Sequence, residues 1–324
     1  MTRWICGWLI TGAMTLSAGA DEPRLTDETV VRFATPEEGR AILAADDAFT
    51  ASLSRFDLQC RMKTDKDVTL ADWKAFVAQH VLAWEPSDIE IVSQSVTRLK
   101  GRLDDYRLPL PAVIELVRTT GDEESGAAYT RGSSIILPPK VTKYDATQLD
   151  RLLLHELFHV FSRHDGAVRA RLYGIVGFEL CEPIKLPDML APRRITNPDA
   201  PLVDCTIALP AMNGKTYIGA PILYASANAY DAKRAPTLFQ SLVFRLLIVE
   251  RRGGRYEPLP FQGEPVVMDP KKEPAFFEKI GQNTNYIIHP DEILADNFVR
   301  MVMQDKDIPT PRIIDEMRKV LAKQ

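Results

Sequence analysis

The sequence predicts an α+β protein with a mixed, mainly antiparallel sheet, an amphipathic helix in mid-chain and an inserted β-rich lobe. Three observations favour this class. Helix-start patterns occur before residue 85 and again after residue 290. Short β-like segments lie between them, and Asn213-Gly214 suits a hairpin turn. The composition, 45% hydrophobic and 26% charged, is that of an ordinary globular protein, and 324 residues allow one large domain or two closely packed lobes.

The first twenty residues are predicted to be an export signal. Residues 1–3 form a short positive start, residues 4–16 are uncharged and mostly apolar, and Ala18-Gly19-Ala20 matches a cleavage site before Asp21. The apolar run is too short to cross a bilayer, which takes about 20 residues in a helix. Loss of 20 of the 324 residues leaves a mature chain of 304. We therefore expect a periplasmic or secreted protein without stable membrane insertion.

The charge pattern gives no sign of a nucleic-acid partner. The formal net charge is −4, and loss of Arg3 with the signal makes it −5. No cluster of basic residues exceeds two or three, so the chain lacks the basic surface that nucleic-acid binding requires.

Residues 21 to about 110 are predicted to form a mostly helical N-terminal region. Thr35, Pro36 and Glu38 make a capping-box start with proline at the first helical position. The elements expected here are a helix from Thr35 toward Phe56, a helix from Thr69 toward Trp84, and a β-like segment over residues 89–96.

Residues 111–324 are predicted to form the domain that carries the chemistry, with an insertion at about residues 181–285. Residues 112–118 are the clearest strand, and Gly132 breaks two β-like stretches within 127–137. Pro210 would confine its strand to a sheet edge. The other expected elements are a helix over 147–164 ended by Gly166, a helix over 167–180, a long irregular surface loop over 183–204, hairpin strands over 206–212 and 215–220, a strand over 242–250, and helices over 274–280, over 290–304 and from 311 onward.

Residues 155–159 read His-Glu-Leu-Phe-His, an H-E-x-x-H pattern in the middle of the expected helix. Histidines four residues apart lie on one helix face, so both rings can bind one cation. Glu156, about a third of a turn from His155, can act as a general base on a metal-bound water without becoming a ligand. His155 and His159 are thus candidate zinc ligands and Glu156 the candidate catalytic base.

A catalytic zinc ion needs a third protein ligand. Glu292 is favoured, because Pro290 suits the first position of a helix and places Glu292 one turn before Asp296 on one face. Glu292 could then reach the metal while Asp296 accepts a hydrogen bond from a ligating imidazole.

Two alternatives for the third ligand stay open. Glu179 follows His159 by 20 residues. Four residues further on, where an orienting residue would be expected, the chain has Pro183, which cannot orient a histidine and would end the helix. Glu182 is only a partial substitute for that orienting residue. Asp165 lies six residues beyond His159 and would need a sharp turn where the chain has Ser162.

Transition-state stabilisation needs a hydrogen-bond donor, and Tyr286 and His289 are the nearest candidates before the Glu292 helix. Packing or capping at the helix entry explains both residues equally well. Tyr224 and Tyr230 are weaker alternatives.

Three cysteines remain after removal of the signal. In an oxidising compartment Cys181 and Cys205 could close a loop over the proline-rich stretch between them. Cys60 is expected to be a small buried apolar residue, and the absence of C-x-x-C excludes a cysteine-based zinc site of that kind.

His155-Glu156-x-x-His159 with a downstream Glu292-x-x-x-Asp296 resembles the gluzincin, or thermolysin-like, zinc metallopeptidases. The resemblance covers only the two metal-site helices. It implies a zincin-like core, zinc held by His155, His159 and Glu292, and Glu156 as general base. It also implies an edge strand within residues 129–137 that binds extended peptide. Glu292 follows His159 by 133 residues, so the chain between them would have to include an inserted lobe.

The expected function is that of an exported zinc metallopeptidase acting on peptide or protein substrates. The rival from another class is a non-catalytic exported binding or scaffold module with a zinc-stabilised core, which a closed fourth coordination position would favour. A metal-free helix is disfavoured because Glu156 would be costly to bury without a partner.

Overall fold

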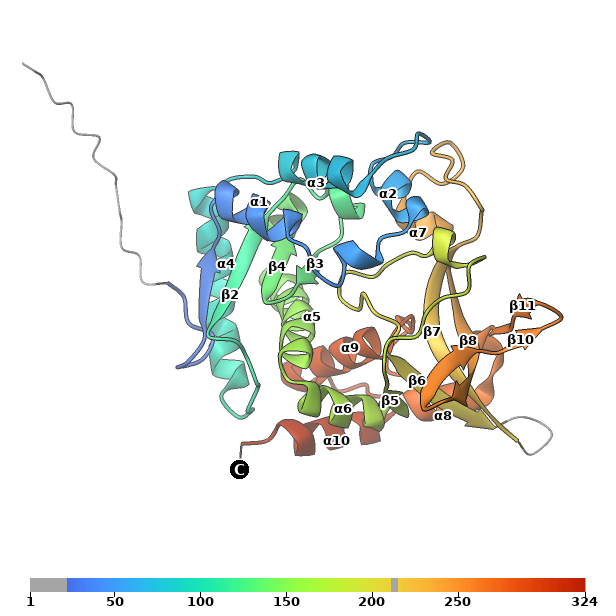
Figure 1. Cartoon of the computed structure of the whole chain (residues 1–324). Helices are drawn as coiled ribbons and strands as arrows, with labels where there is room; N and C mark the ends of the chain where they lie inside the picture. Colours follow the sequence, from blue (N-terminus) through green and yellow to red (C-terminus); the bar gives the residue numbers. More distant parts are fainter. Residues whose placement is uncertain (1–21, 211–214, 324) are drawn as a thin grey trace, which may run out of the picture.

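Two β-sheets lie on either side of a central helix pair in the computed structural model, which describes residues 22–210 and 215–323 (Figure 1). The central helices are α5 (Ala146–His164) and α9 (Pro290–Met303). The predicted signal and the Asn213-Gly214 turn lie outside the described residues. Helices together with mixed and antiparallel sheets confirm the α+β class.

The first sheet has four strands in the order β1-β2-β4-β3. Three of them run parallel, and β3 pairs antiparallel with β4 at the sheet edge. Their bounds are β1 Val30–Phe33, β2 Val113–Arg118, β3 Tyr129–Arg131 and β4 Ser134–Leu137.

Both faces of this sheet are buried. Ile135 and Leu137 belong to the main core with α5, whereas Ile136 belongs to a second core with Trp73 and Val77 of α3. Alternate residues of a strand point to opposite faces, so β4 joins both cores and places α5 against one face.

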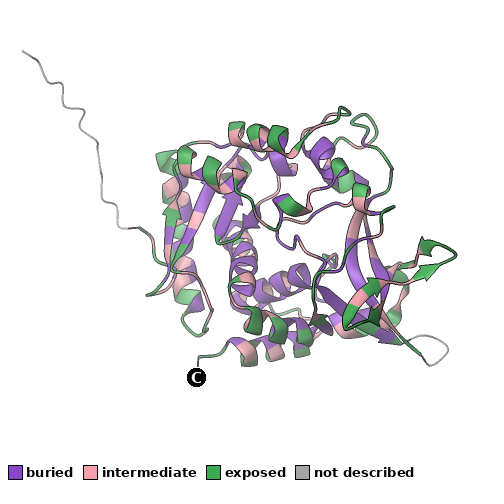
Figure 2. Ribbon diagram, in the orientation of Figure 1, coloured by how far each residue is buried: buried purple, intermediate pink, exposed green. Residues whose placement is uncertain are grey.

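The second sheet is antiparallel, in the order β12-β8-β7-β6-β5, with β9 also paired to β8. Its strands are β5 Phe178–Leu180, β6 Cys205–Pro210, β7 Thr216–Ala225, β8 Leu242–Arg252, β9 Arg255–Pro258 and β12 Val267–Met268. A separate small hairpin, β10 (Pro260–Phe261) with β11 (Glu264–Pro265), projects from this side and is largely exposed (Figure 2).

The other helices surround these layers, with α6 and α10 side by side beneath the central pair in Figure 1. Their bounds are α1 Pro36–Ala44, α2 Arg55–Arg61, α3 Leu70–Gln79, α4 Pro86–Leu103, α6 Gly166–Ile175, α7 Leu238–Ser241, α8 Pro274–Ile280 and α10 Pro311–Leu321. Within residues 22–210 and 215–323, no helix is long and apolar enough to cross a membrane.

Several sequence predictions are confirmed closely. Capping boxes begin α1 at Thr35 and α3 at Thr69, and the strand at 113–118, the β3–β4 pair and the helices at 274–280 and after 290 are all present. β6, β7 and β8 also form where strands were expected.

Other predictions are wrong for identifiable reasons. Residues 89–96 lie inside α4, because Val92, Val96 and Leu99 recur at helical spacing and are buried. The helix expected to reach Phe56 ends at Ala44. β6 is not an edge strand, since it pairs with both β5 and β7, and Pro210 lies at its very end.

The region after the motif helix also differs from expectation. Gly166 begins α6 instead of ending α5, because Asp165 caps α6 through its side chain. Gly177, with φ of +79°, then turns the chain from α6 into β5. The 183–204 segment is irregular as predicted, but it is not a surface loop, since Ile195, Thr196 and Asp199 are buried.

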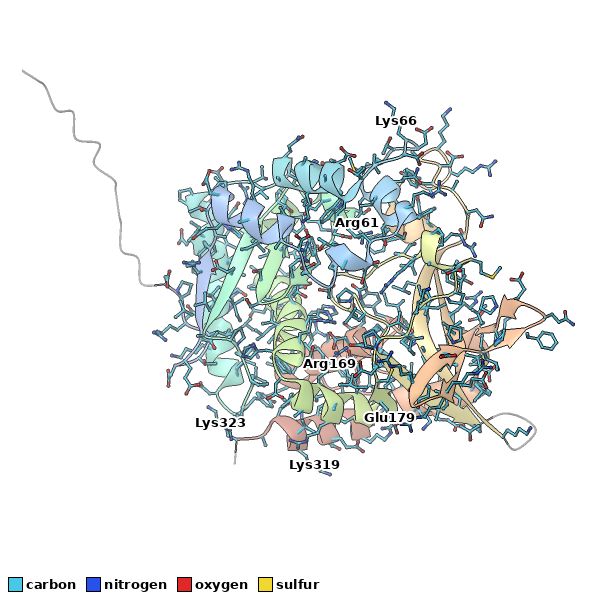
Figure 3. The ribbon with its side chains drawn as sticks, in the orientation of Figure 1. Arg61, Lys66, Arg169, Glu179, Lys319 and Lys323 are labelled. Carbon is cyan, nitrogen blue, oxygen red and sulfur yellow. The ribbon has the colours of Figure 1, made fainter. Side chains whose placement is uncertain are left out.

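A buried ion cluster fixes this segment to the N-terminal region. Arg61 donates to Glu124 Oε1 at 2.6 Å, to the carbonyl oxygen of Thr196 at 2.8 Å, and to Asp57. Asp57 also accepts from the Thr196 amide at 3.0 Å and hydroxyl at 2.8 Å. Arg61, the last residue of α2, is 2% exposed and links this helix to the segment (Figure 3). It therefore helps to set where residues 197–199 lie.

We expect Arg61→Ala to lower the free energy of unfolding by about 3–5 kcal/mol, because Asp57 and Glu124 would keep buried charges without their counter-ion. Urea unfolding followed by tryptophan fluorescence measures the loss. Arg40→Ala is the matched control, since in the part of the chain that the structure describes Arg40 makes one ion pair, with the exposed Glu37. Equal small losses for the two variants would contradict the role given to Arg61.

Candidate metal centre

The H-E-x-x-H residues lie in mid-helix, as predicted. A capping box between Asp145 and Gln148 begins α5, whose apolar residues pack into the main core. The side of α5 that carries His155, Phe158 and His159 packs against α9, so both histidines point across the helix interface toward the acidic residues of α9.

Three predicted ligands converge at this interface. His155 Nε2 lies 3.2 Å and His159 Nε2 lies 3.4 Å from the same oxygen, Glu292 Oε2. The ligand atoms of the three residues all lie within 4.8 Å of one another. Asn197 donates to Glu292 Oε1 at 2.6 Å and fixes the carboxylate. The three residues could therefore hold a metal ion.

Each histidine is oriented by its own carboxylate. His155 Nδ1 donates to Asp296 Oδ1 at 3.1 Å, as predicted, and Thr284 donates to the other Asp296 oxygen. His159 Nδ1 donates to Asp291 Oδ2 at 2.8 Å. Because the Nδ1 atoms are taken, both Nε2 atoms face Glu292, which is the orientation a ligand histidine needs.

Asp291 is a functional residue that the sequence analysis missed. Acidic residues are common in the first turn of a helix, but Asp291 is fully buried and accepts hydrogen bonds from Ser162 at 3.0 Å and from Tyr173 at 2.9 Å. Burial opposes its ionisation, but the hydrogen bond from His159 and the charge of Arg163 hold its pKa well below the usual range. One orienting carboxylate, Asp296, is predicted from the sequence for two histidine ligands. The missing partner of the second histidine is the signal that could have pointed to Asp291.

Glu156 is buried next to the three ligands, with only 3% of its surface exposed. Its Oε2 atom and His159 Nε2 make no hydrogen bond with any residue that the structure describes. Burial, followed by the charge of Asp199, raises the pKa of Glu156 to about 8. An unpartnered buried carboxylate is costly, so this arrangement favours a cation or a catalytic role.

Asp199, on the 183–204 segment, also belongs to the site. One oxygen of Asp199 lies within 4.8 Å of ligand atoms of Glu156 and His159. Neither Asp199 nor Asn197 was predicted, because nothing in a proline-rich segment indicates that it turns inward.

The donor set fits a divalent cation. Five carboxylates surround two imidazoles: those of Glu156, Asp199, Asp291, Glu292 and Asp296. Although burial opposes protonation, hydrogen bonds to Asp296 and Glu292 raise the pKa of His155 to about 10. The site therefore attracts positive charge strongly, and a metal would replace a proton there.

A cleft of about 560 Å³ opens onto the cluster. His155, Glu156, Asp199 and Glu292 line its metal-site end, and Arg151 and Arg300 line it farther along α5 and α9. Tyr286 also lines it and stacks on His155, with ring centroids 6.2 Å apart. The negative charge of Glu292 and partial burial raise the pKa of Tyr286, which favours the protonated phenol, a hydrogen-bond donor.

The other donor candidates lie elsewhere. His289 caps α9, where its Nδ1 accepts from the Asp291 amide at 3.2 Å, and its Nε2 is 3.7 Å from Cys205 Sγ. Burial lowers its pKa to about 4. His289 therefore has the capping role weighed for it and does not face the cleft. Tyr224 and Tyr230 are also absent from the cleft lining.

Neither alternative third ligand joins the cluster. Glu179 is exposed on β5 and lines a separate cleft with Arg251, while Asp165 is occupied in capping α6 (Figure 3). The cysteine prediction is partly confirmed. Cys60 is a buried thiol, but Cys181 and Cys205 are free thiols, so the suggested disulfide is not formed.

Comparisons with protein-family models, with curated proteins and with solved structures found no match to this chain.

We expect Asp291→Asn to weaken zinc binding by roughly 10–100-fold, because the amide can no longer hold His159 in its ligating orientation as an anion does. Competition with a chromophoric chelator measures the affinity. Glu179→Gln, which neutralises an exposed carboxylate, is the control and should bind zinc as the wild type does. An unchanged affinity in Asp291→Asn would show that Asp291 does not orient the ligand.

Metal removal should destabilise the fold, because the buried carboxylates would then repel one another. At free zinc one hundred times Kd, we expect a stabilisation of about 2.7 kcal/mol over the metal-free protein. Thermal unfolding with zinc and with a chelator measures the difference. Coincident curves would argue against a site that binds zinc in the folded state.

Proposed function

We propose that this protein is a zinc-dependent metallopeptidase of the gluzincin type, exported and cleaved after about residue 20. His155, His159 and Glu292 would hold the zinc ion, which matches the two-imidazole, one-carboxylate set of catalytic zinc sites. The sequence of residues 1–20 supports export, and the donor types support zinc over harder cations.

The observation that carries the proposal is the buried and unpartnered Glu156 beside these ligands. A purely structural metal site has no need of a further acidic group that lines a cleft and has no hydrogen-bond partner for one oxygen among the described residues. A catalytic site does, because a general base with a raised pKa can take and return a proton near neutral pH.

When bound, zinc would supply Lewis acidity toward a water molecule and toward the scissile carbonyl. The protein groups do the rest. Glu156 accepts the proton of the attacking water and passes it to the leaving amine. Tyr286, which stacks on His155 and lines the cleft, would donate to the developing negative charge.

Peptide would not bind along the whole predicted edge strand. β3 is the sheet edge, but its residues are buried, and the Thr130 amide already donates to Asp199 at 2.7 Å. Ala127 and Ala128, just before β3, line the cleft instead. An extended substrate in the cleft would therefore contact the chain at Ala127 and Ala128.

Asp199 favours a second candidate function, a non-catalytic zinc-stabilised module. Its carboxylate lies where it could occupy a coordination position that hydrolysis needs open. The two functions differ in what Glu156 does, so one substitution separates them.

We expect Glu156→Gln to keep one equivalent of zinc and to lose peptide hydrolysis by roughly 10²–10⁴-fold, because glutamine is nearly isosteric but cannot accept the proton. Cleavage of a peptide library by the zinc-loaded mature protein measures activity, and metal analysis measures zinc. Glu179→Gln is the control and should stay active. Full activity in Glu156→Gln would refute the mechanism, and a wild type that binds zinc but cleaves nothing would favour the non-catalytic module.

A further inference from the structure

We propose that the end of the cleft away from the metal centre binds a carboxylate of the peptide substrate through Arg300 and Lys140. This inference rests on the proposed function, because it names the class of peptide that the same site would accept. The carboxylate is either the C-terminus of the substrate or the side chain of an aspartate or glutamate residue, and peptides of different design distinguish the two.

The two central helices run antiparallel, so the cleft extends from the metal centre toward the start of α5 and the end of α9. Three contacts between the two parts of the chain give the order: His159 with Asp291, His155 with Asp296, and Arg151 with Asp305. Arg151 lies one turn, or about 6 Å, before His155 on α5. Arg300 lies two turns, or about 12 Å, after Glu292 on α9. Both arginines therefore line the cleft beyond the metal ligands.

The two ends of the cleft have opposite charge. The carboxylates that line it all belong to the candidate metal centre, namely Glu156, Asp199, Glu292 and Asp296. The cationic side chains that line it are Lys140, Arg151 and Arg300. A metal ion would offset the acidic end and leave the basic end without a counter-charge. A cleft of this kind attracts an anionic group of a ligand.

Arg300 and Lys140 have charge available for a ligand. Arg300 is partly buried, and among the described residues it donates one hydrogen bond, from Nη1 to the carbonyl oxygen of Asp307 at 3.2 Å. Lys140, three residues after β4, is exposed and makes no hydrogen bond or ion pair with any residue that the structure describes. Arg151 differs, because both of its terminal nitrogens donate to Asp305 at 2.8 Å. We therefore assign the carboxylate to Arg300 and Lys140, with Arg151 as part of the cleft wall.

The distance between the two ends fits a short stretch of extended peptide. An extended chain advances about 3.3 Å per residue, so the roughly 6–12 Å along the helices corresponds to about two to four residues. The cleft volume of about 560 Å³ lies in the usual range of ligand pockets. A carboxylate at that distance from the scissile carbonyl would meet the guanidinium of Arg300, whose planar set of N–H groups matches the two oxygens of a carboxylate.

The test compares three sets of peptides that share one neutral core sequence. The first set ends in an amide, the second ends in a free carboxylate, and the third ends in an amide and has glutamate at each position in turn. We expect the zinc-loaded mature protein to cleave the second or the third set with a kcat/KM at least about tenfold above the first, the effect of one charged hydrogen bond. Preference for the second set identifies the C-terminus as the source, and preference for the third identifies a side chain.

Arg300→Gln and Lys140→Gln should reduce this preference, and Lys143→Gln is the matched control. Each variant loses one positive charge, but Lys143 is exposed and is not among the residues that line the cleft. The ratio of kcat/KM between carboxylate and neutral peptides should fall toward unity in the first two variants and match the wild type in the third. A misfolded or zinc-poor protein loses both activities alike, so the ratio reports the carboxylate contact. Lys140 is exposed, so Lys140→Gln is expected to fold even where Arg300→Gln does not.

Either of two results would overturn the inference and leave the proposed function intact. One is an equal kcat/KM for the three sets of peptides. The other is a preference for carboxylate peptides that Arg300→Gln and Lys140→Gln retain in full.

No cleavage of any set would instead contradict the proposed function. Fluorescence anisotropy of dye-labelled peptides from the same three sets then tests the basic end by binding to the zinc-loaded protein. Tighter binding of the carboxylate peptides that is lost in Arg300→Gln and Lys140→Gln would support a carboxylate site. Equal binding of the three sets would overturn it.

Discussion

The packing of α5 against α9 is the constraint on which the site depends. Two histidines one turn apart on α5 meet three carboxylates of α9, and all four Nδ1 and Nε2 atoms face an acidic oxygen. The same helices share the apolar core through Phe158, Phe161 and Phe298. Hydrophobic packing therefore fixes the distance between the two helices. The hydrogen bonds then select the side-chain rotamers of the histidines and carboxylates at that distance.

Burying so much negative charge has a cost that the fold must offset. Arg163 lies 3.7 Å from Asp291, and Ser162 and Tyr173 donate to the same carboxylate, so the α9 side has local compensation. Glu156 and Asp199 have less compensation: among the described residues only Thr130 donates to Asp199, and one oxygen of Glu156 has no partner. The imbalance lies on the cleft side of the cluster. That is where a cation, unlike another hydrogen bond, would relieve it.

The sequence predicted the parts of the site that follow from helical periodicity. His155 and His159, and Glu292 and Asp296, are pairs at i and i+4, so their spacing alone places each pair on one face. Contacts between distant segments leave no periodic pattern in the sequence. Asn197 and Asp199 could not be predicted because they belong to an irregular segment whose position depends on the contacts of Thr196 with Arg61 and Asp57. The same limit explains the fold errors. Residues 89–96 include β-branched side chains, which favour a strand. They form part of α4 because helical spacing buries Val92 and Val96 in the main core.

His289 illustrates how the same physical facts can support different roles. A histidine beside a predicted ligand helix suits a transition-state donor, and it equally suits a cap. In the fold its Nδ1 accepts the Asp291 amide, which leaves Nε2 as the protonated nitrogen directed at Cys205. Capping at this point orients the first turn of α9, and with it Asp291 and Glu292. His289 thus contributes to the metal centre through the backbone, by fixing the helix start from which two of its carboxylates project.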